Sequence, residues 1–272
     1  VYKRQTYKHD ISFKCGDLTF NLHHARGETD DHTWIHVPEE KLIAPGDLFI
    51  WAVPNGGNPQ KVQRYISDWA DALDEMLKLD CEIFLPGHGF PILGKKRIKK
   101  ALETTSKFLR SIEDQTLKLM NQGKSLNQVL HEVKIPNDLM ELPWLTPIYD
   151  DPQFLIRMIW RRYGGWWDGE YDRLLPAPRK EEALAWVELS NGIDNIVLKA
   201  LEHLDKGNLK VAAQLIETAF HADNNNNQMH DARAKIYREF SLKQSSSMGR
   251  NILNHASMAS TQGKRDLAQT ED

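Results

Sequence analysis

The first third of the chain alternates short apolar runs with turn residues. Six short runs have the alternating or continuously apolar pattern of β-strands, residues 11–15, 18–23, 33–37, 42–44, 48–53 and 82–85. Gly16 and Asp17 separate the first two runs and predict a β-hairpin. Residues 62–77 repeat apolar side chains at helical spacing. This order of strands, helix and strand predicts a layered α/β domain over residues 1–95.

After about residue 95 the apolar side chains recur with the longer period of helices. Residues 97–122 contain no Gly or Pro, and Gly123 follows them as a stop signal. Ser125 predicts the N-cap of a short helix. Five further segments have helical spacing, residues 154–162, 182–189, 195–204, 209–222 and 229–240. We therefore expect an all-α domain over residues 96–242, and the polar, weakly periodic residues 243–272 predict a disordered tail.

Composition adds few constraints to this picture. The 272 residues are 40% hydrophobic and 27% charged, enough for two domains with cores, and the net charge of −3 argues against general attraction to nucleic acid. No apolar run approaches the roughly 18 residues of a membrane span. Cys15 and Cys81 show no CxxC spacing, which favours two buried thiols over a disulfide framework. Nothing in the sequence assigns a cellular compartment.

Three tight turns place metal-binding side chains beside apolar runs. Glu28, Asp47 and His88 each follow a glycine, and the two carboxylates are separated by a predicted strand, turn and strand. In dinuclear zinc hydrolases, carboxylate and imidazole ligands converge from several loop ends, and a shared carboxylate holds two ions about 3.5–4 Å apart. The three side chains therefore predict half of a two-metal hydrolase site.

Neighbouring polar residues have competing interpretations. Three residues lie close enough to replace Glu28 as a ligand, Asp30, Asp31 and His32. His23 and His24 occupy adjacent strand positions that face opposite sides of a sheet, so structural roles are favoured for both. For Asn55 and Asn58, turn formation is favoured over lining a substrate pocket.

The order and spacing of these motifs resemble a known family. Gly46-Asp47-Leu48 is similar to the turn that supplies the bridging aspartate of metallo-β-lactamase-fold hydrolases, and Gly87-His88 is similar to the turn that supplies a histidine of the second metal. Glu28 stands where most of that superfamily has histidine, which is a mark of the alkyl sulfatase branch. Residues 161–169, Arg-Arg-Tyr-Gly-Gly-Trp-Trp-Asp-Gly, resemble the start of the alkyl sulfatase dimerisation domain. The resemblance covers residues 10–240.

This resemblance implies a fold and an activity. It implies the C-terminal half of a metallo-β-lactamase αββα sandwich, followed by an all-α dimerisation domain that forms a homodimer. It also implies two zinc ions in the complete protein, with Glu28 on one, Asp47 on both and His88 on the other; iron or manganese stays open, because carboxylate-rich sites accept them. The implied reaction is the cleavage of a small-molecule sulfate ester by a metal-activated water, with catalytic and substrate-binding residues unassigned.

The chain also departs from the family pattern. The His-x-His-x-Asp-His motif is absent from the 272 residues, and residues 1–5 match a translation of a transposon end used in sequencing libraries. We therefore interpret the chain as an N-terminally truncated fragment that alone binds zinc poorly and is inactive. The expected sulfate-binding arginine has no direct match, although Gln60 and Lys61 stand near its place and Arg64 follows one helical turn later. Two alternatives stay open: a hydrolase of a thioester, lactone or phosphoester on the same fold, and a non-enzymatic dimerising remnant.

Overall fold

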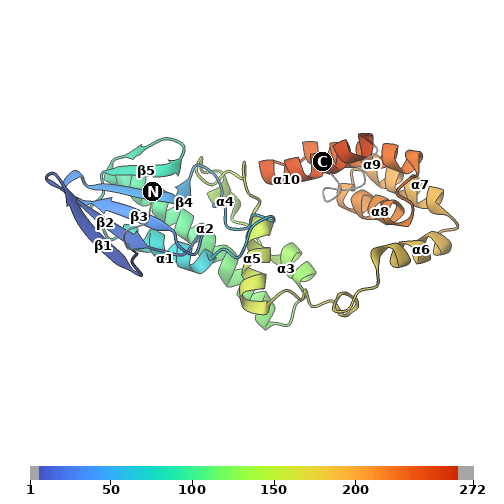
Figure 1. The fold of residues 1–272 in the computed structure, drawn as a ribbon, viewed down its shortest axis with the longest axis horizontal. Helices are drawn as coiled ribbons and strands as arrows, with labels where there is room; N and C mark the ends of the chain where they lie inside the picture. The colour runs from blue at the N-terminus through green and yellow to red at the C-terminus, as the bar shows by residue number, and fades with distance from the viewer. Residues whose placement is uncertain (1–5, 263–272) are drawn as a thin grey trace. The chain divides into compact units, whose positions relative to one another are not determined.

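The computed structural model describes residues 6–262, and the interpretation of residues 1–5 lies outside this range. The chain divides into two compact units, Val1–Glu170 and Tyr171–Asp272. The first contains a β-sheet and helices, and the second is helical (Figure 1). The predicted fold class, an α/β part followed by an all-α part, is confirmed. Within residues 6–262, no helix has the length and apolar character needed to cross a membrane.

The first unit is built on one mixed sheet of six strands in chain order. The strands are β1 (Asp10–Cys15), β2 (Leu18–His24), β3 (Thr33–Val37), β4 (Leu42–Ile50), β5 (Ile83–His88) and β6 (Ile92–Leu93). Neighbouring strands pair antiparallel except β4 and β5, which run parallel. A short 3-10 turn, η1 (Pro38–Glu40), joins β3 to β4. The parallel pair requires a crossover connection, and this connection contains the helix predicted from the apolar spacing.

Two local features of the sheet follow from glycines with positive φ. Gly16 adopts φ +59° in the turn between β1 and β2, as expected for the predicted hairpin. Gly46 adopts φ +56° inside β4, where the pairing with β5 shifts register. The apolar runs 42–44 and 48–53, expected as two strands, therefore belong to one strand with an irregularity at Gly46.

Two long helices cover the sheet and complete a shared core. α1 (Ile66–Met76) and α2 (Lys95–Asn121) pack against each other and against β4 and β5 (Figure 1). Trp69 of α1 is fully buried, and its indole N–H donates to the Leu48 carbonyl of β4 at 2.6 Å. The predicted helix over residues 62–77 begins later than expected, at Ile66, and leaves Val62 exposed.

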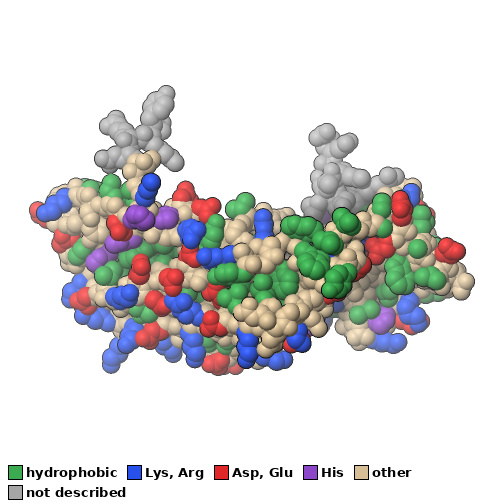
Figure 2. Space-filling model, turned by 90° about the horizontal axis from the view of Figure 1, so that it is seen from below, with side chains coloured by type: hydrophobic (Ala, Val, Ile, Leu, Met, Phe, Trp, Pro, Cys, Tyr) green, Lys and Arg blue, Asp and Glu red, His purple; other side chains and the backbone are tan. Residues whose placement is uncertain are grey.

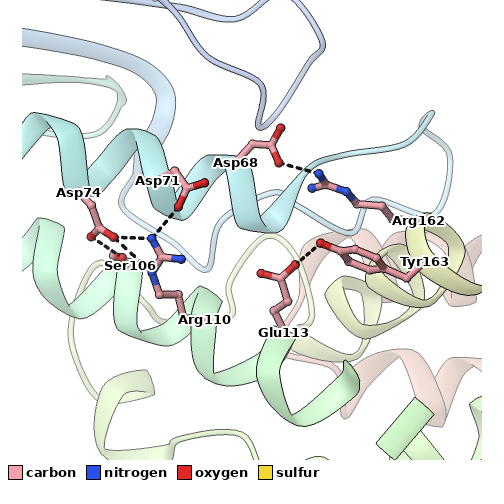
Figure 3. Close-up of polar contacts among 8 residues, drawn as sticks. All are labelled: Asp68, Asp71, Asp74, Ser106, Arg110, Glu113, Arg162 and Tyr163. Carbon is pink, nitrogen blue, oxygen red and sulfur yellow. Dashed lines mark hydrogen bonds and ion pairs between the residues drawn. The ribbon is translucent and has the colours of Figure 1, made fainter. Parts of the chain in front are cut away.

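Three further helices belong to the same unit, α3 (Leu126–Glu132), α4 (Asn137–Met140) and α5 (Pro152–Gly164). Ser125 forms a capping box with Gln128 at the start of α3, which confirms the predicted N-cap. Polar contacts join α1, α2 and α5 (Figure 3): Arg110 with Asp71 and Asp74, Arg162 with Asp68, and Tyr163 with Glu113. Because these helices share one apolar core with the sheet, the first compact unit extends to residue 170, where the sequence placed a boundary near residue 95.

Up to residue 262, where the described part of the second unit ends, five helices follow a short 3-10 turn, η2 (Tyr171–Arg173). They are α6 (Arg179–Leu189), α7 (Ile193–Asp205), α8 (Leu209–Ala222), α9 (Asn227–Leu242) and α10 (Ser247–Thr261). A second apolar core lies among α7, α8 and α9, with Ile216 and Ile236 fully buried.

Helix α10 occupies 15 residues of the segment 243–272, half of the tail that the composition predicted to be disordered. It packs closely on α9, although it buries mainly small residues, Ser257, Ala259 and Ser260. Arg233 of α9 donates to the Ala256 carbonyl at 2.9 Å and to the Ser260 hydroxyl at 3.0 Å. A helix held by small side chains and polar contacts has little apolar periodicity, which explains the difference from the prediction. Residues 263–272 of the predicted tail lie outside the described residues.

Acidic and basic side chains are interspersed over the face of the molecule seen in Figure 2, as expected for a net charge of −3.

Candidate functional site

A cavity of about 590 Å³ in the first unit is lined by Glu28, Asp47 and His88. The structure thus brings all three predicted metal ligands to one place, although residues 28 and 88 are far apart in sequence. The other lining residues come from the end of β4, the loop after it, β5 and a distant segment, and they are Ile50, Trp51, Ala52, Asn55, Asn58, Lys61, Arg64, Gly89, Ile148 and Tyr149.

Parallel pairing of β4 and β5 places Asp47 beside His88. Gly46 pairs with Pro86 and Ile50 pairs with His88, so both side chains stand where the two strands end together. His88 Nε2 lies 3.5 Å from Asp47 Oδ1, and the His88 side chain is 74% exposed. A Cβ atom at Gly87 would collide with the Asp47 carboxylate and with the Gly46 backbone. Glycine at position 87 is therefore what allows the two strand ends to approach this closely.

Glu28 lies on the turn between β2 and β3 and is held from two sides. Its Oε1 lies 2.5 Å from Arg64 Nη1, and the Asn55 side-chain amide donates to the same oxygen at 3.4 Å. The Tyr65 amide donates to the Gly27 carbonyl at 3.0 Å, which ties the turn to the segment just before α1. The Glu28 carboxylate is mostly buried and directed at a cation of the protein itself.

Glu28, Asp47 and His88 carry oxygen and nitrogen atoms that suit zinc, but the three side chains do not converge on one point. Among residues 6–262, no cluster of three or more His, Cys, Asp and Glu side chains is placed to hold a metal ion. Asp47 and His88 form a close oxygen and nitrogen pair, which suits a borderline cation. Glu28 lines the same cavity but is paired with Arg64.

The loop after β4 contains two buried polar atoms without hydrogen-bond partners, both in residues that line the cavity. Arg64 is only 4% exposed, and its side chain contacts Glu28 and donates to the Asn55 carbonyl. Its Nε atom and the Asn55 Oδ1 atom are buried without a hydrogen-bond partner in the structure. Asn58 also lines the cavity and is buried, although its side chain accepts from the Gln60 amide at 3.0 Å as expected for a turn residue. Buried polar atoms of this kind are commonly completed by water or a ligand.

One buried acid near the cavity was missed by sequence reasoning. Asp150 is fully buried, and burial raises the pKa of its carboxyl to about 6, although backbone amides of Gly57 and Asp151 and the charge of Arg64 oppose this shift. Gly57 is part of the loop that lines the cavity, and no local pattern around residue 150 indicates such a partner. Asp150 therefore connects this loop to the segment just before α5.

The histidines outside the cavity have structural contacts. The His23 ring stacks on Trp34 with centroids 4.1 Å apart, and its Nδ1 lies 2.6 Å from Asp10 Oδ1. His24 Nε2 lies 2.8 Å from the carbonyl of Asp30, and His32 Nε2 lies 2.8 Å from the carbonyl of Pro45. These contacts agree with the structural roles favoured for His23 and His24, and they leave Glu28 as the residue of its turn that lines the cavity.

The helical unit contains a second cavity of about 600 Å³ whose charged groups bind each other. Arg233 Nε lies 2.7 Å from Glu217 Oε1, and the guanidinium carbon lies 4.3 Å from the Phe220 ring centroid and 5.0 Å from that of Tyr237. The first cavity is lined by residues that carry buried polar atoms without partners, so it is the stronger candidate for a binding or catalytic site.

The chain is similar in sequence to known proteins, both over its helical residues and over most of its length. A family model described as alkyl sulfatase dimerisation matches residues 125–263. A linear primary-alkylsulfatase of a Pseudomonas species is 25% identical over 236 residues, which are 86% of this chain and 45% of the relative. An alkyl/aryl-sulfatase of Saccharomyces cerevisiae is 27% identical over 183 residues, 67% of this chain and 28% of the relative.

A solved structure shares the fold. The stereoselective inverting sec-alkylsulfatase Pisa1 from Pseudomonas sp. superposes with a TM-score of 0.89 at 23% identity, over 95% of this chain and 42% of that one. The chain thus spans less than half the length of these relatives.

Proposed function

Because this chain belongs to the alkyl sulfatase dimerisation family, we propose that it forms part of a zinc-dependent hydrolase that cleaves sulfate esters. The observation that carries the proposal is the convergence of Glu28, Asp47 and His88 on the cavity that also contains Arg64 and Lys61. Metal ligands and cations in one cavity suit an anionic ester. The alkylsulfatase names of the relatives support the same substrate class.

The proposed ligands are Glu28 for one zinc ion, Asp47 for both and His88 for the other, with the remaining ligands supplied by sequence outside this chain. When bound, zinc lowers the pKa of a coordinated water and polarises the ester oxygen. Arg64 has an unpartnered Nε–H and would bind a sulfate oxygen, with Lys61 adding a second positive charge.

The apolar part of the cavity would accept the alcohol portion of the ester. It is lined by Ile50 at the end of β4, by Trp51 and Ala52 just after this strand, and by Ile148 from the distant segment. This lining favours an alkyl chain over a sugar or a nucleotide, because transfer of a hydrocarbon from water to apolar surface is favourable.

We further propose that the helical unit mediates a homodimer. The family model that matches residues 125–263 is named for dimerisation. Light scattering of the purified chain should give twice the monomer mass of 31.4 kDa. A single species at 31.4 kDa at micromolar concentration would contradict a stable dimer through this region.

The activity is tested on the full-length protein encoded by the source gene. We expect a His-x-His-x-Asp-His motif upstream of Thr6, zinc by metal analysis, and octyl sulfate hydrolysis that a chelator removes and zinc restores. Asp47→Asn and His88→Ala should each lower turnover more than about 100-fold, since loss of even an outer ligand partner costs about 10–100-fold. His131→Ala is the matched control, because His131 lies on the surface of α3.

The outcomes separate the alternatives. Turnover of an acyl thioester, a lactone or an aryl phosphodiester without turnover of octyl sulfate would keep the metal site and overturn the substrate. A genuine start codon upstream with no such motif, together with no zinc and no turnover, would identify a dimerising remnant.

A further inference from the structure

The loop that lines the cavity is tied to a segment about 93 residues later in the chain. Three hydrogen bonds join residues 53–63 to residues 146–158, from Val53 N to Thr146 O (3.0 Å), from Gly57 N to Asp150 Oδ2 (2.9 Å) and from Gln63 Nε2 to Met158 O (3.0 Å). Of the three acceptors, only the Asp150 carboxylate is a side chain that can carry a charge; the other two are backbone carbonyls. The later segment lies inside residues 125–263, the range matched by the dimerisation model.

Asp150 binds backbone amides with both carboxylate oxygens. Its Oδ2 accepts from Gly57 in the loop, and its Oδ1 accepts from Asp151 at 3.0 Å, just before α5. A Cβ atom at Gly57 would collide with the backbone of Phe154 and Leu155, so the loop lies directly on the first turn of α5. A buried carboxylate is tolerated when its oxygens are hydrogen-bonded, and here the partners are the two elements that must be held together.

The bonds of this loop continue to the predicted metal ligand. The Asn55 carbonyl, two residues before Gly57, accepts from the Arg64 guanidinium. Arg64 in turn lies 2.5 Å from Glu28, and the Asn55 side chain also donates to Glu28. Displacement of the loop from α5 would therefore move the carbonyl that orients Arg64.

We propose that Asp150 is a positioning residue for the cavity: through Gly57 it holds the loop that fixes Arg64 against Glu28. The dimerisation-matched region then has a second task, which is to build one wall of the substrate cavity. The part of this inference that concerns substrate rests on the proposed function, whereas the part that concerns the loop and Arg64 does not.

The test uses Asp150→Asn with Asp151→Ala as the matched control. Asn preserves the shape of the side chain but accepts with one oxygen, whereas Asp151→Ala removes the N-cap that accepts from Gln153 at 2.8 Å at the start of α5. Amide exchange of Gly57 and solvent exchange of the Arg64 Nε–H are followed by NMR on the purified chain. Both should become at least about tenfold faster in Asp150→Asn and change little in Asp151→Ala, as expected for loss of a charge-assisted hydrogen bond.

Either exchange rate remaining at its wild-type value in Asp150→Asn would overturn the inference. If that variant does not fold, the wild-type protein decides: a Gly57 amide that exchanges as fast as an exposed loop would equally overturn it. In the full-length protein, Asp150→Asn should raise KM for octyl sulfate several-fold with little change in kcat. A wild-type protein that does not hydrolyse octyl sulfate would contradict the proposed function and leave the exchange result to decide the role of Asp150.

Discussion

Asp150 should give the first unit an unusual dependence of stability on pH. Burial raises its pKa to about 6 in the folded protein from an ordinary value of 3.8. Between about pH 4 and pH 6 the folded protein therefore holds a proton at Asp150 that the unfolded chain releases. Acidification through this window stabilises the fold with respect to this group, and the stabilisation is lost as pH rises through 6.

The size of the effect follows from the shift. About 2 pKa units at about 1.4 kcal/mol each correspond to about 3 kcal/mol in total, of which about 2 kcal/mol is reached by pH 4.5. Asp150→Asn carries no titrating group at this position and should lack this term. The free energy of unfolding of the wild-type protein, relative to that of Asp150→Asn, should therefore rise by about 2 kcal/mol between pH 7 and pH 4.5.

Urea unfolding at the two pH values measures this difference. Tryptophan fluorescence reports mainly the first unit, because seven of the eight tryptophans precede residue 171. Exposed carboxyl groups with a lowered pKa, such as that of Glu82 hydrogen-bonded to Lys41, stabilise the fold less as the pH falls. Because both proteins contain these groups, their effect cancels in the comparison. Equal pH dependence of the two proteins, within about 0.5 kcal/mol, would refute the reasoning that Asp150 is a buried titrating carboxyl, since about 2 kcal/mol is expected.

Three further substitutions test other parts of the first unit. Gly87→Ala should displace the Asp47 carboxylate and lower zinc affinity of the full-length protein at least about tenfold, measured by competition with a chromophoric chelator. Unchanged affinity would show that the strand ends tolerate the added Cβ. Ser125→Ala should cost about 1 kcal/mol in urea unfolding by removing the α3 cap, and a loss below about 0.3 kcal/mol would contradict that role. Tyr163→Phe should cost about 1–3 kcal/mol, because the buried Glu113 loses a hydroxyl donor at 2.8 Å. No change in its unfolding free energy would indicate that water replaces the hydroxyl.

Sequence reasoning succeeded where structure depends on neighbouring residues. The hairpin at Gly16 needs a residue that accepts positive φ, and the start of α3 needs Ser125 and Gln128 three positions apart. Asp47 and His88 each follow a glycine at the end of an apolar run, and the structure brings them together at one cavity; that they bind metal stays a prediction. In each case the deciding contacts lie within a few positions or within one strand pair.

The errors occur where the deciding contact is distant or is not apolar. Pro45 and Gly46 look like a break between strands, but β5 pairs on both sides of them and β4 continues. Helix α10 has weak apolar periodicity because polar groups such as the Arg233 guanidinium help to hold it. The role of Asp150 depends on Gly57, 93 positions earlier, and nothing near either residue indicates the other.

Two parts of the cavity are therefore held in place by different contacts, one by pairing between neighbouring strands and the other by hydrogen bonds to a segment distant in sequence. Asp47 and His88 are placed by the pairing of β4 with β5, so the proposed zinc contacts of these two residues should depend mainly on the sheet, whereas Glu28 is held by Arg64 and Asn55 of the loop. Arg64 is placed by a loop that depends on α5 and the segment before it, so the proposed sulfate contact of Arg64 should depend on residues matched by the dimerisation model. Substitutions in residues 146–158 should therefore change the affinity of the full-length protein for octyl sulfate more than they change zinc binding at Asp47 and His88. A buried carboxylate at position 150 costs stability at neutral pH, and its presence is explained if the position of this loop is required for function.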